Sequence, residues 1–278
     1  MDKFKSFYLL VLITLMAMPS LMGQEVGLQL YSLRDQFKND VEGTLKTIHD
    51  WGITKIEGGD TYGLPLDEFI TLLKKYELEV VSVGASFEEL ENNPEGVVEK
   101  AKAYGASYVM CAWIPHEGDN FTLEDTQKAV DVFNNAGEIL DRDNIILTYH
   151  PHGYEFRPHG EGTLFDHMSE NAEDFYFEMD VYWVQHGGAD PMELLNRYSD
   201  QFVLMHLKDM EKGVKGNDTG HEDVETNVVL GTGQINMSAI VAKAKELGIK
   251  YLFIEDESSR VVEQVPKSLA YLKTLENQ

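Results

Sequence analysis

Eight short apolar runs alternate with longer amphipathic segments over most of this 278-residue chain. Each run has the length and composition of a buried strand, while the segments between them show helical spacing. The runs are residues 26–31, 55–59, 79–85, 107–114, 145–150, 175–180, 202–206 and 251–255. Strands that alternate with helices form parallel sheets, and eight such units can close into a barrel. We therefore predict an α/β protein with a (β/α)8 TIM barrel; a doubly wound open sheet is the alternative.

The first residues of the chain differ in character from the rest. A short basic start, an apolar stretch at residues 7–22 and the small Gly23 before Gln24 are typical of a secretory signal peptide. We therefore expect residues 1–23 to be removed and residues 24–278 to form one periplasmic or secreted domain without a stable membrane anchor. The alternative is an uncleaved anchor, which the shortness of the apolar stretch and Pro19 disfavour.

The charge of the chain limits its partners. It has 48 acidic and 23 basic residues and a formal net charge of −25. Such a surface repels phosphate backbones, so we expect no nucleic-acid partner. The lone Cys111 cannot form an intramolecular disulfide, and its place in the apolar run YVMCAWI indicates a buried, inert thiol. The sequence leaves a homo-oligomer open.

Four of the eight runs end on a side chain that can bind a metal ion: His150, Asp180, His206 and Glu255. In a barrel of parallel strands the active site lies at the carboxyl ends of the strands, so these side chains should converge there. Asp180 taken alone could equally cap a helix or a turn. Two imidazoles and two carboxylates suit one divalent Mn, Co, Zn or Fe ion, and Mg less well.

Several motifs are shared with a known family. They are GLQLYSLRD at residues 27–35, GITKIEGG at 52–59, YHPHGYEF at 149–156, FEMDVYWV at 177–184 with GGADP at 187–191, HLKD at 206–209, LGTGQIN at 230–236 and FIEDESS at 253–259. With these motifs the sequence resembles the xylose isomerase-like TIM-barrel superfamily, and within it the exported sugar phosphate isomerase/epimerase branch. HLKD together with IEDE is the most specific part. The superfamily holds sugar isomerases, ketose 3-epimerases, inosose dehydratases and endonuclease IV-type enzymes.

The resemblance implies that the metal ligands include Asp180, His206 and Glu255. His150 then takes the fifth-strand position where many members carry Glu. Epimerases of the superfamily tend to have His three residues after the sixth-strand Asp, whereas this chain has Trp183 there and His186 later. Ketohexose epimerases of the superfamily use two metal-bound glutamates as opposing bases, and this chain would lack one of them because His150 replaces the fifth-strand Glu. The chain therefore looks closer to the exported isomerase/epimerase-like and inosose dehydratase-like proteins.

A general base must lie at the same strand ends, within hydrogen-bond reach of the substrate. The candidates are Glu255, His152 and Glu57. His152 alternates with His150 and should face the same side of an extended strand, although a loop histidine paired with an acid is the alternative. Lys208 should share a face with His206, where it could stabilise an oxyanion, act as an acid or form a plain salt bridge.

Aromatic and polar side chains near the strand ends are expected to form the walls of a carbohydrate pocket. They are Tyr31, Trp113, Trp183, Glu57 and His186; for each, ordinary packing or a strand-end charge is the alternative. The segment GTGQ at residues 231–234 is too short for a phosphate loop and lacks its Lys, which indicates an unphosphorylated substrate. The long irregular stretch at residues 209–234 should cover the active site, or else be a solvated insertion.

These features predict a metal-dependent isomerase or epimerase that acts on an unphosphorylated sugar or keto-sugar. A cation chelated by adjacent carbonyl and hydroxyl oxygens acidifies the neighbouring C–H and stabilises the resulting enediolate. If a β-hydroxyl or alkoxide leaves instead, the same chemistry gives a dehydratase or lyase of the inosose dehydratase type. A barrel that binds metal and sugar without turnover is the third possibility, while the negative charge argues against an endonuclease IV-like phosphoesterase.

Overall fold

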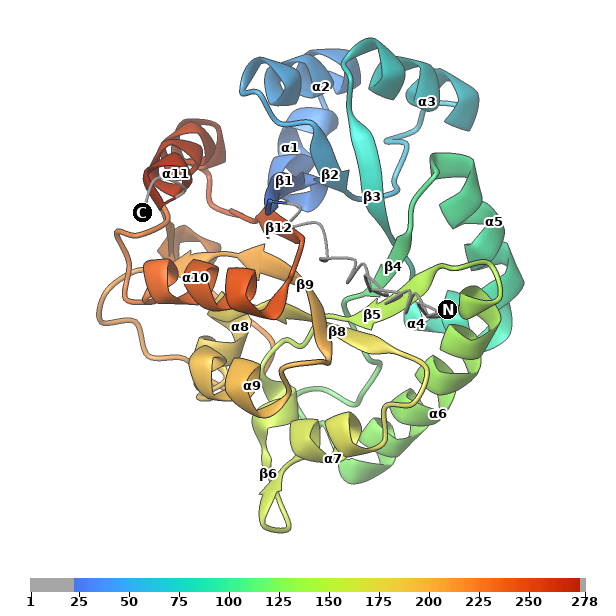
Figure 1. Cartoon of the computed structure of the whole chain (residues 1–278), viewed down its shortest axis with the longest axis vertical. Coiled ribbons are helices and arrows are strands. Elements are labelled where there is room, and N and C mark those ends of the chain that lie inside the picture. Colours follow the sequence, from blue (N-terminus) through green and yellow to red (C-terminus); the bar gives the residue numbers. More distant parts are fainter. Residues whose placement is uncertain (1–22, 276–278) are drawn as a thin grey trace, which may run out of the picture.

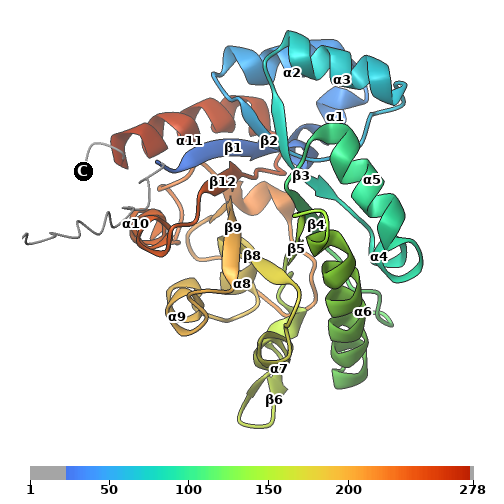
Figure 2. The same ribbon diagram turned by 45° about the vertical axis from the view of Figure 1, so that its right-hand side comes forward.

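The chain forms a closed barrel of eight parallel strands, as the sequence predicts (Figure 1, and turned by 45° in Figure 2). The computed structural model describes residues 23–275, so nearly all of the predicted signal peptide lies outside the described residues. Around the barrel the order is β1-β12-β9-β8-β5-β4-β3-β2. The strands are β1 (Glu25–Gln29), β2 (Lys55–Glu57), β3 (Glu79–Gly84), β4 (Tyr108–Cys111), β5 (Ile146–Tyr149), β8 (Tyr176–Asp180), β9 (Phe202–Leu207) and β12 (Tyr251–Ile254).

Helices form an outer layer around the barrel (Figure 1). Six longer helices, and the seven-residue α9 with Pro191 in its first turn, coincide with the predicted amphipathic segments: α2 (Val41–Asp50), α3 (Leu66–Lys75), α5 (Pro94–Tyr104), α6 (Leu123–Asp141), α9 (Pro191–Arg197), α10 (Met237–Leu247) and α11 (Val261–Leu275). Four further helices have at most seven residues: α1 (Arg34–Phe37), α4 (Phe87–Asn92), α7 (Leu164–Glu170) and α8 (Val181–His186). Segments of one or two turns are too short to show a helical period, which is why the sequence pattern does not reveal them.

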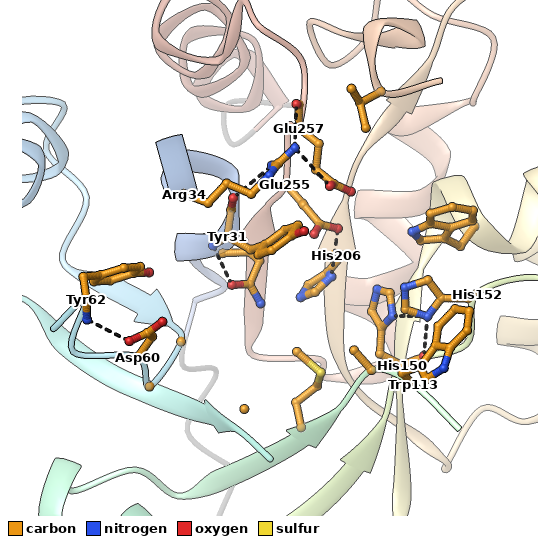
Figure 3. Close-up of a pocket in the computed structure, with 18 of the residues that line it drawn as sticks. Tyr31, Arg34, Asp60, Tyr62, Trp113, His150, His152, His206, Glu255 and Glu257 are labelled. Carbon is orange, nitrogen blue, oxygen red and sulfur yellow. Dashed lines mark hydrogen bonds and ion pairs between the residues drawn. The ribbon is translucent and has the colours of Figure 1, made fainter. Parts of the chain in front are cut away.

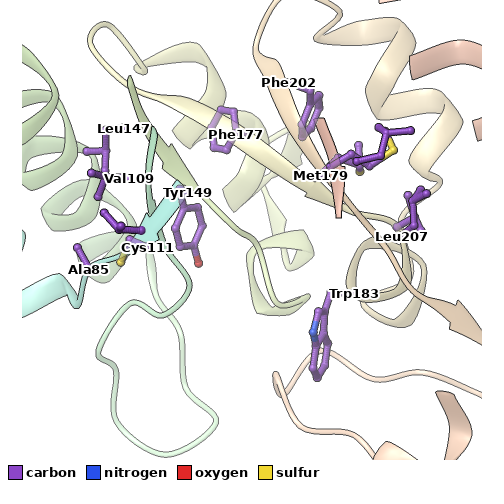
Figure 4. Packing of buried hydrophobic residues seen from close by; sticks show 14 of the residues in the cluster. Ala85, Val109, Cys111, Leu147, Tyr149, Phe177, Met179, Trp183, Phe202 and Leu207 are labelled. Carbon is purple, nitrogen blue, oxygen red and sulfur yellow. The ribbon is translucent and has the colours of Figure 1, made fainter. Parts of the chain in front are cut away.

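The main core lies between the strands and the helices. Val109, Leu147 and Phe177 are buried there from three neighbouring strands, and Figure 4 shows part of this packing. Cys111 is a free, fully buried thiol in the same core, as predicted, and burial raises its pKa to about 12. An inert structural role follows for this cysteine.

The inside of the barrel is layered. Val81, Leu204 and Phe253 form a small separate apolar cluster. Because side chains alternate along a strand, the residues two positions after Leu204 and Phe253 face the same interior, and these are His206 and Glu255. The apolar cluster therefore fills the interior of the barrel below the carboxyl ends of the strands, and polar side chains fill the interior at those ends.

The long stretch between β9 and α10 lies over this end of the barrel. It contains the short pair β10 (Asp209–Met210) and β11 (Asn227–Val228) and a 3-10 helix at Val224–Thr226. Its residues Gly220, His221 and Glu222 line the central cavity, as expected for an active-site cover. A second hairpin, β6 (Pro158–His159) and β7 (Gly162–Thr163), lies beyond β5. In the part of the chain described, no helix is long and apolar enough to span a bilayer.

Candidate metal and substrate site

Four neighbouring strands bring the candidate ligands together. His150 directly follows β5, Asp180 ends β8, His206 lies near the end of β9 and Glu255 directly follows β12. All four side chains are buried, and each offers one ligand atom within 4.8 Å of the others. The convergence arises because inward-facing positions at the carboxyl ends of parallel strands meet in the barrel mouth.

The distances between these atoms suit one metal ion. His150 Nε2 lies 3.2 Å and His206 Nδ1 3.7 Å from Asp180 Oδ2, and His206 Nδ1 lies 3.3 Å from Glu255 Oε2. A tetrahedral site with metal–ligand bonds of about 2.1 Å would have edges of about 3.4 Å. His206 Nδ1 and Glu255 Oε2 are buried without a hydrogen-bond partner, as expected of atoms that await a cation. The donor set thus fits a divalent ion.

Asp180 caps a helix, which is compatible with its place in the candidate ligand set. Its Oδ1 accepts a hydrogen bond from Trp183 N at 2.9 Å at the start of α8, while Oδ2 faces the two histidines. Burial opposes its ionisation, but the hydrogen bond with His150 and the neighbouring imidazole of His206 hold the pKa of Asp180 well below its ordinary value. The cap fixes the carboxylate in the orientation that the site requires.

Two further carboxylates lie behind His206. Glu57 Oε1 is 2.6 Å from His206 Nε2 and also accepts a hydrogen bond from Gln29 at 2.7 Å, while Glu178 Oε1 lies 3.2 Å from the same Nε2. Glu57 is fully buried and does not line the cavity, so the predicted roles as base or sugar ligand need correction. Glu57 instead contacts Nε2 of His206, the ring nitrogen that faces away from the candidate ligand set. Glu178 was missed, although it lies two residues before Asp180 and therefore on the same face of β8.

The buried carboxylates control the charge of this region. Burial and then the neighbouring Glu57 raise the pKa of Glu178 well above its ordinary value. Burial alone would lower the pKa of His206, but the carboxylates of Glu178, Glu255 and Glu57 raise it well above its ordinary value. The site therefore attracts positive charge strongly.

Replacing Glu57 with glutamine should weaken metal binding without abolishing it. A carboxylate that accepts the N–H of a ligating imidazole fixes its tautomer, and its loss typically costs about 10- to 100-fold in metal affinity. Competition with a chelator of known affinity measures the change. Glu79→Gln, on a mostly exposed glutamate paired with Lys55 at the other end of the barrel, is the control. Equal affinity in both variants would contradict the orienting role.

A cavity of about 1200 Å³ opens above the candidate ligands. Figure 3 shows His150, His152 and Trp113 together on one side of it, with His206 and Glu255 nearer the centre. The His152 ring centroid lies 4.5 Å from that of His150, so the two residues face the same side as predicted. Burial and the neighbouring His150 lower the pKa of His152 well below its ordinary value, which leaves the imidazole neutral.

The predicted aromatic walls are present. Tyr31, Trp113 and Trp183 all line the cavity, and Trp183 packs 5.0 Å from the ring of His152. His186 does not line it: this residue is buried and stacks on Tyr182 with ring centroids 5.4 Å apart. The predicted substrate contact of His186 therefore needs correction.

Lys208 is fully buried and does not line the cavity either. Its Nζ lies 2.6 Å from Glu222 Oε1 and donates to Glu257 Oε1 at 2.7 Å. Burial opposes the charge, but Glu255, Glu257 and Glu222 raise the pKa of Lys208 well above its ordinary value. The structure thus favours the salt-bridge interpretation over a catalytic one, and Lys208 ties the covering stretch to the end of β12.

Substituting Lys208 with methionine should destabilise the fold strongly. The change leaves buried carboxylates without their cation, which typically costs about 3–5 kcal/mol in free energy of unfolding. Lys243→Met is the control, because Lys243 pairs with the exposed Glu246 and such surface pairs contribute about 0–1 kcal/mol. Urea denaturation of both variants measures the difference; equal losses would show that the buried pair contributes nothing special.

The LGTGQIN segment has its amide groups already occupied. Asp209 accepts hydrogen bonds from the backbone N–H groups of Gly231, Gly233, Ile235 and Met210 at 2.8–3.2 Å. A side chain of the protein thus fills the place that a phosphate would take in a loop of amide donors. These amide groups therefore do not form a phosphate loop, as the sequence predicts.

Several polar residues of the cavity were not predicted. Among them are Arg34, Asp60, Lys100, His221 and Glu222. They belong to loops and helices, where no alternation pattern marks the side that faces the cavity.

Sequence comparison assigns the chain to a family. The profile of the family described as xylose isomerase-like TIM barrel matches residues 45–275. The chain belongs to this family. No curated protein gave a match.

Solved structures of the same fold cover nearly the whole chain. A sugar phosphate isomerase/epimerase from Parabacteroides distasonis is 24% identical, with a TM-score of 0.74 and coverage of 90% of this chain and 98% of that one. The probable 3-DHS dehydratase AsbF from Bacillus anthracis is 15% identical over 90% and 99% of the two chains, with a TM-score of 0.67. The IolI protein, solved with a zinc atom, is 15% identical over 91% and 97%, with a TM-score of 0.69. At these identities the likeness concerns the fold.

Proposed function

We propose that the protein is a metal-dependent isomerase or epimerase acting on an unphosphorylated sugar or keto-sugar. The observation that carries the proposal is the convergence of His150, Asp180, His206 and Glu255 at the floor of a large cavity with aromatic walls. Unpartnered ligand atoms at the floor indicate a cation, and exposed aromatic faces suit the C–H faces of a sugar.

In this proposal the four candidate ligands hold the metal ion, and His152 transfers the proton. A divalent cation held by the four ligands would polarise adjacent carbonyl and hydroxyl oxygens and stabilise the enediolate that forms on loss of a C–H proton. His152 lines the cavity beside the ligand set, and its neutral imidazole can accept that proton. Return of the proton to the neighbouring carbon gives an isomer, and its return to the same carbon from the other face gives an epimer.

A dehydratase or lyase is the second candidate, and one observation favours it. His152 lines the cavity beside the ligand set and is not itself a candidate ligand. Of the other acids and imidazoles there, Glu222 and Glu257 are ion-pair partners of Lys208, and His221 contacts Trp113. Among the described residues that line the cavity near the ligand set, the second base that two-base epimerisation needs would have to be Glu255, which is also a candidate ligand. Loss of a β-oxygen leaving group from the same enediolate would need only one base.

We also propose that the protein works outside the cytoplasm. The support is the signal-peptide pattern of residues 1–23, and a strongly acidic surface that suits small sugars better than nucleic acid. Mass spectrometry of the mature chain from the native host would test the cleavage. A new amino terminus at Gln24 is the expected result, and an intact first residue would contradict it.

The function is tested by metal analysis together with proton exchange. We expect about one divalent transition metal per chain after loading with Mn, Co or Zn, and metal-dependent incorporation of solvent deuterium into at least one member of a keto-sugar panel. Product analysis then separates isomerisation, epimerisation and elimination. A protein that stays metal-free would overturn the proposal, while bound metal and sugar without exchange would point to a barrel that binds but does not react.

A further inference from the structure

The cavity is larger than one sugar ring requires. Pockets of about 300–1000 Å³ accommodate drug-sized ligands, and a monosaccharide has only about half as many atoms as such a ligand. The cavity here measures about 1200 Å³. In Figure 3 its labelled residues extend from His150 and His152 on one side, past Tyr31, to Asp60 and Tyr62 on the other. The cavity therefore continues beyond the candidate metal ligands to the loop after β2.

Two exposed aromatic side chains mark the two parts of the cavity. Of the large apolar or aromatic side chains that the described structure leaves exposed, only Tyr31, at 54%, and Trp113, at 40%, line the cavity. Trp113 lies beside His152, with ring centroids 5.7 Å apart, and so belongs to the metal side. Tyr31 lies between that side and the loop after β2 (Figure 3). Each ring offers a surface for one sugar unit.

The ring of Tyr31 is held in place. Arg34 covers one of its faces, with the guanidinium carbon 4.5 Å from the ring centroid. Arg34 is itself fixed by the Tyr31 carbonyl at 3.1 Å and by Glu257 O at 3.3 Å. One aromatic face is therefore occupied and the other is left for a ligand, which makes Tyr31 a fixed platform with little ordering to lose on binding.

The far part of the cavity carries polar groups suited to hydroxyls. Lys100 Nζ uses one of its three donors on Gly84 O at 2.8 Å and keeps two. Asp60 Oδ1 accepts from Tyr62 N at 2.7 Å, and its second oxygen retains acceptor capacity. The Tyr62 ring stacks on Phe37 at 3.9 Å, which fixes the loop that carries these groups. Polar groups thus line the same cavity as Tyr31, on the side of the loop after β2.

We infer that the site takes a two-ring carbohydrate, a disaccharide or glycoside, with one ring at the candidate metal beside Trp113 and the second on Tyr31 facing residues 58–63. The inference rests on the proposed function for the first ring and adds the second subsite. Substrate size is then set by Tyr31, Lys100 and the loop after β2, none of which touches the metal ligands.

Calorimetric titration of the Mn-loaded mature protein tests the second subsite. The probes are cellobiose, maltose, lactose and sucrose, compared with glucose, galactose and fructose. We expect at least one disaccharide to bind about tenfold or more tightly than either of its own monosaccharides. Tyr31→Ala should remove most of this ratio, as should Lys100→Met, whereas Tyr176→Ala, on an exposed tyrosine outside the cavity, should preserve it. Circular dichroism confirms that each variant is folded.

The outcomes separate this inference from the proposed function. Monosaccharides that bind and exchange protons while no disaccharide binds more tightly would overturn the second subsite and leave the proposed function standing. A ratio that survives both Tyr31→Ala and Lys100→Met would also overturn it. Absence of binding by every sugar of the panel to a metal-loaded protein would contradict both proposals.

Discussion

Asp180→Asn is expected to remove the bound metal and with it the turnover. The amide oxygen of asparagine can still accept the hydrogen bond from Trp183 N that begins α8, so the fold should survive. The negative charge between His150 and His206 is lost, however, and the amide nitrogen cannot act as a ligand. Removing a residue that only hydrogen-bonds to a metal ligand typically lowers metal affinity by about 10- to 100-fold. The loss of metal affinity in Asp180→Asn should be larger, because the ligand itself is changed. Elemental analysis and deuterium exchange measure both effects.

Asp190→Asn is a matched control for this substitution. Asp190 caps α9 with hydrogen bonds to Met192 N and Glu193 N, but it is exposed and lies outside the cavity. The same chemical change at a helix cap should therefore leave metal content and exchange intact. Full metal occupancy in Asp180→Asn would show that the four side chains are not one binding site.

The fold could be predicted because its signals are local. Each barrel strand is a continuous apolar run, since parallel strands are covered on the outside by helices and packed on the inside. Glycines in left-handed conformations mark where α5 and α10 end, at Gly105 and Gly248, as the sequence suggests. The short helices α4 and α8 have no left-handed glycine at the C-cap, so this signal does not mark them.

The candidate ligand set could also be anticipated from the sequence. His150, Asp180, His206 and Glu255 each end an apolar run, and the geometry of a parallel barrel alone brings such positions together. The argument does not depend on how many residues separate these positions along the chain. It works for residues at the carboxyl edge of the sheet, where each strand supplies one inward position.

The sequence does not predict how deeply a side chain at a strand end is buried within the barrel. Glu57 also ends a strand, yet it lies behind His206 instead of beside the cavity, because β2 is short and its register shifts between Ile56 and Glu57. The burial of Lys208 depends on Glu222, which arrives from a loop whose path the sequence does not encode in any period. Side-chain chemistry can nominate a residue for a site, but its partners decide whether substrate can reach it.

His152→Gln is expected to lower the rate of deuterium exchange by about 10²–10⁴-fold, the usual contribution of a general base, while the metal stays bound. Glutamine retains a polar side chain of similar reach but cannot accept a proton from carbon. His221→Gln is the control, because His221 lines the same cavity but its ring contacts Trp113 and none of the candidate ligands, so this variant should keep most of the exchange. Metal analysis shows that only the base has been removed. Unchanged exchange in His152→Gln would exclude this base and transfer the role to Glu255, the other cavity-facing candidate, which would then have to bind the metal and move the proton.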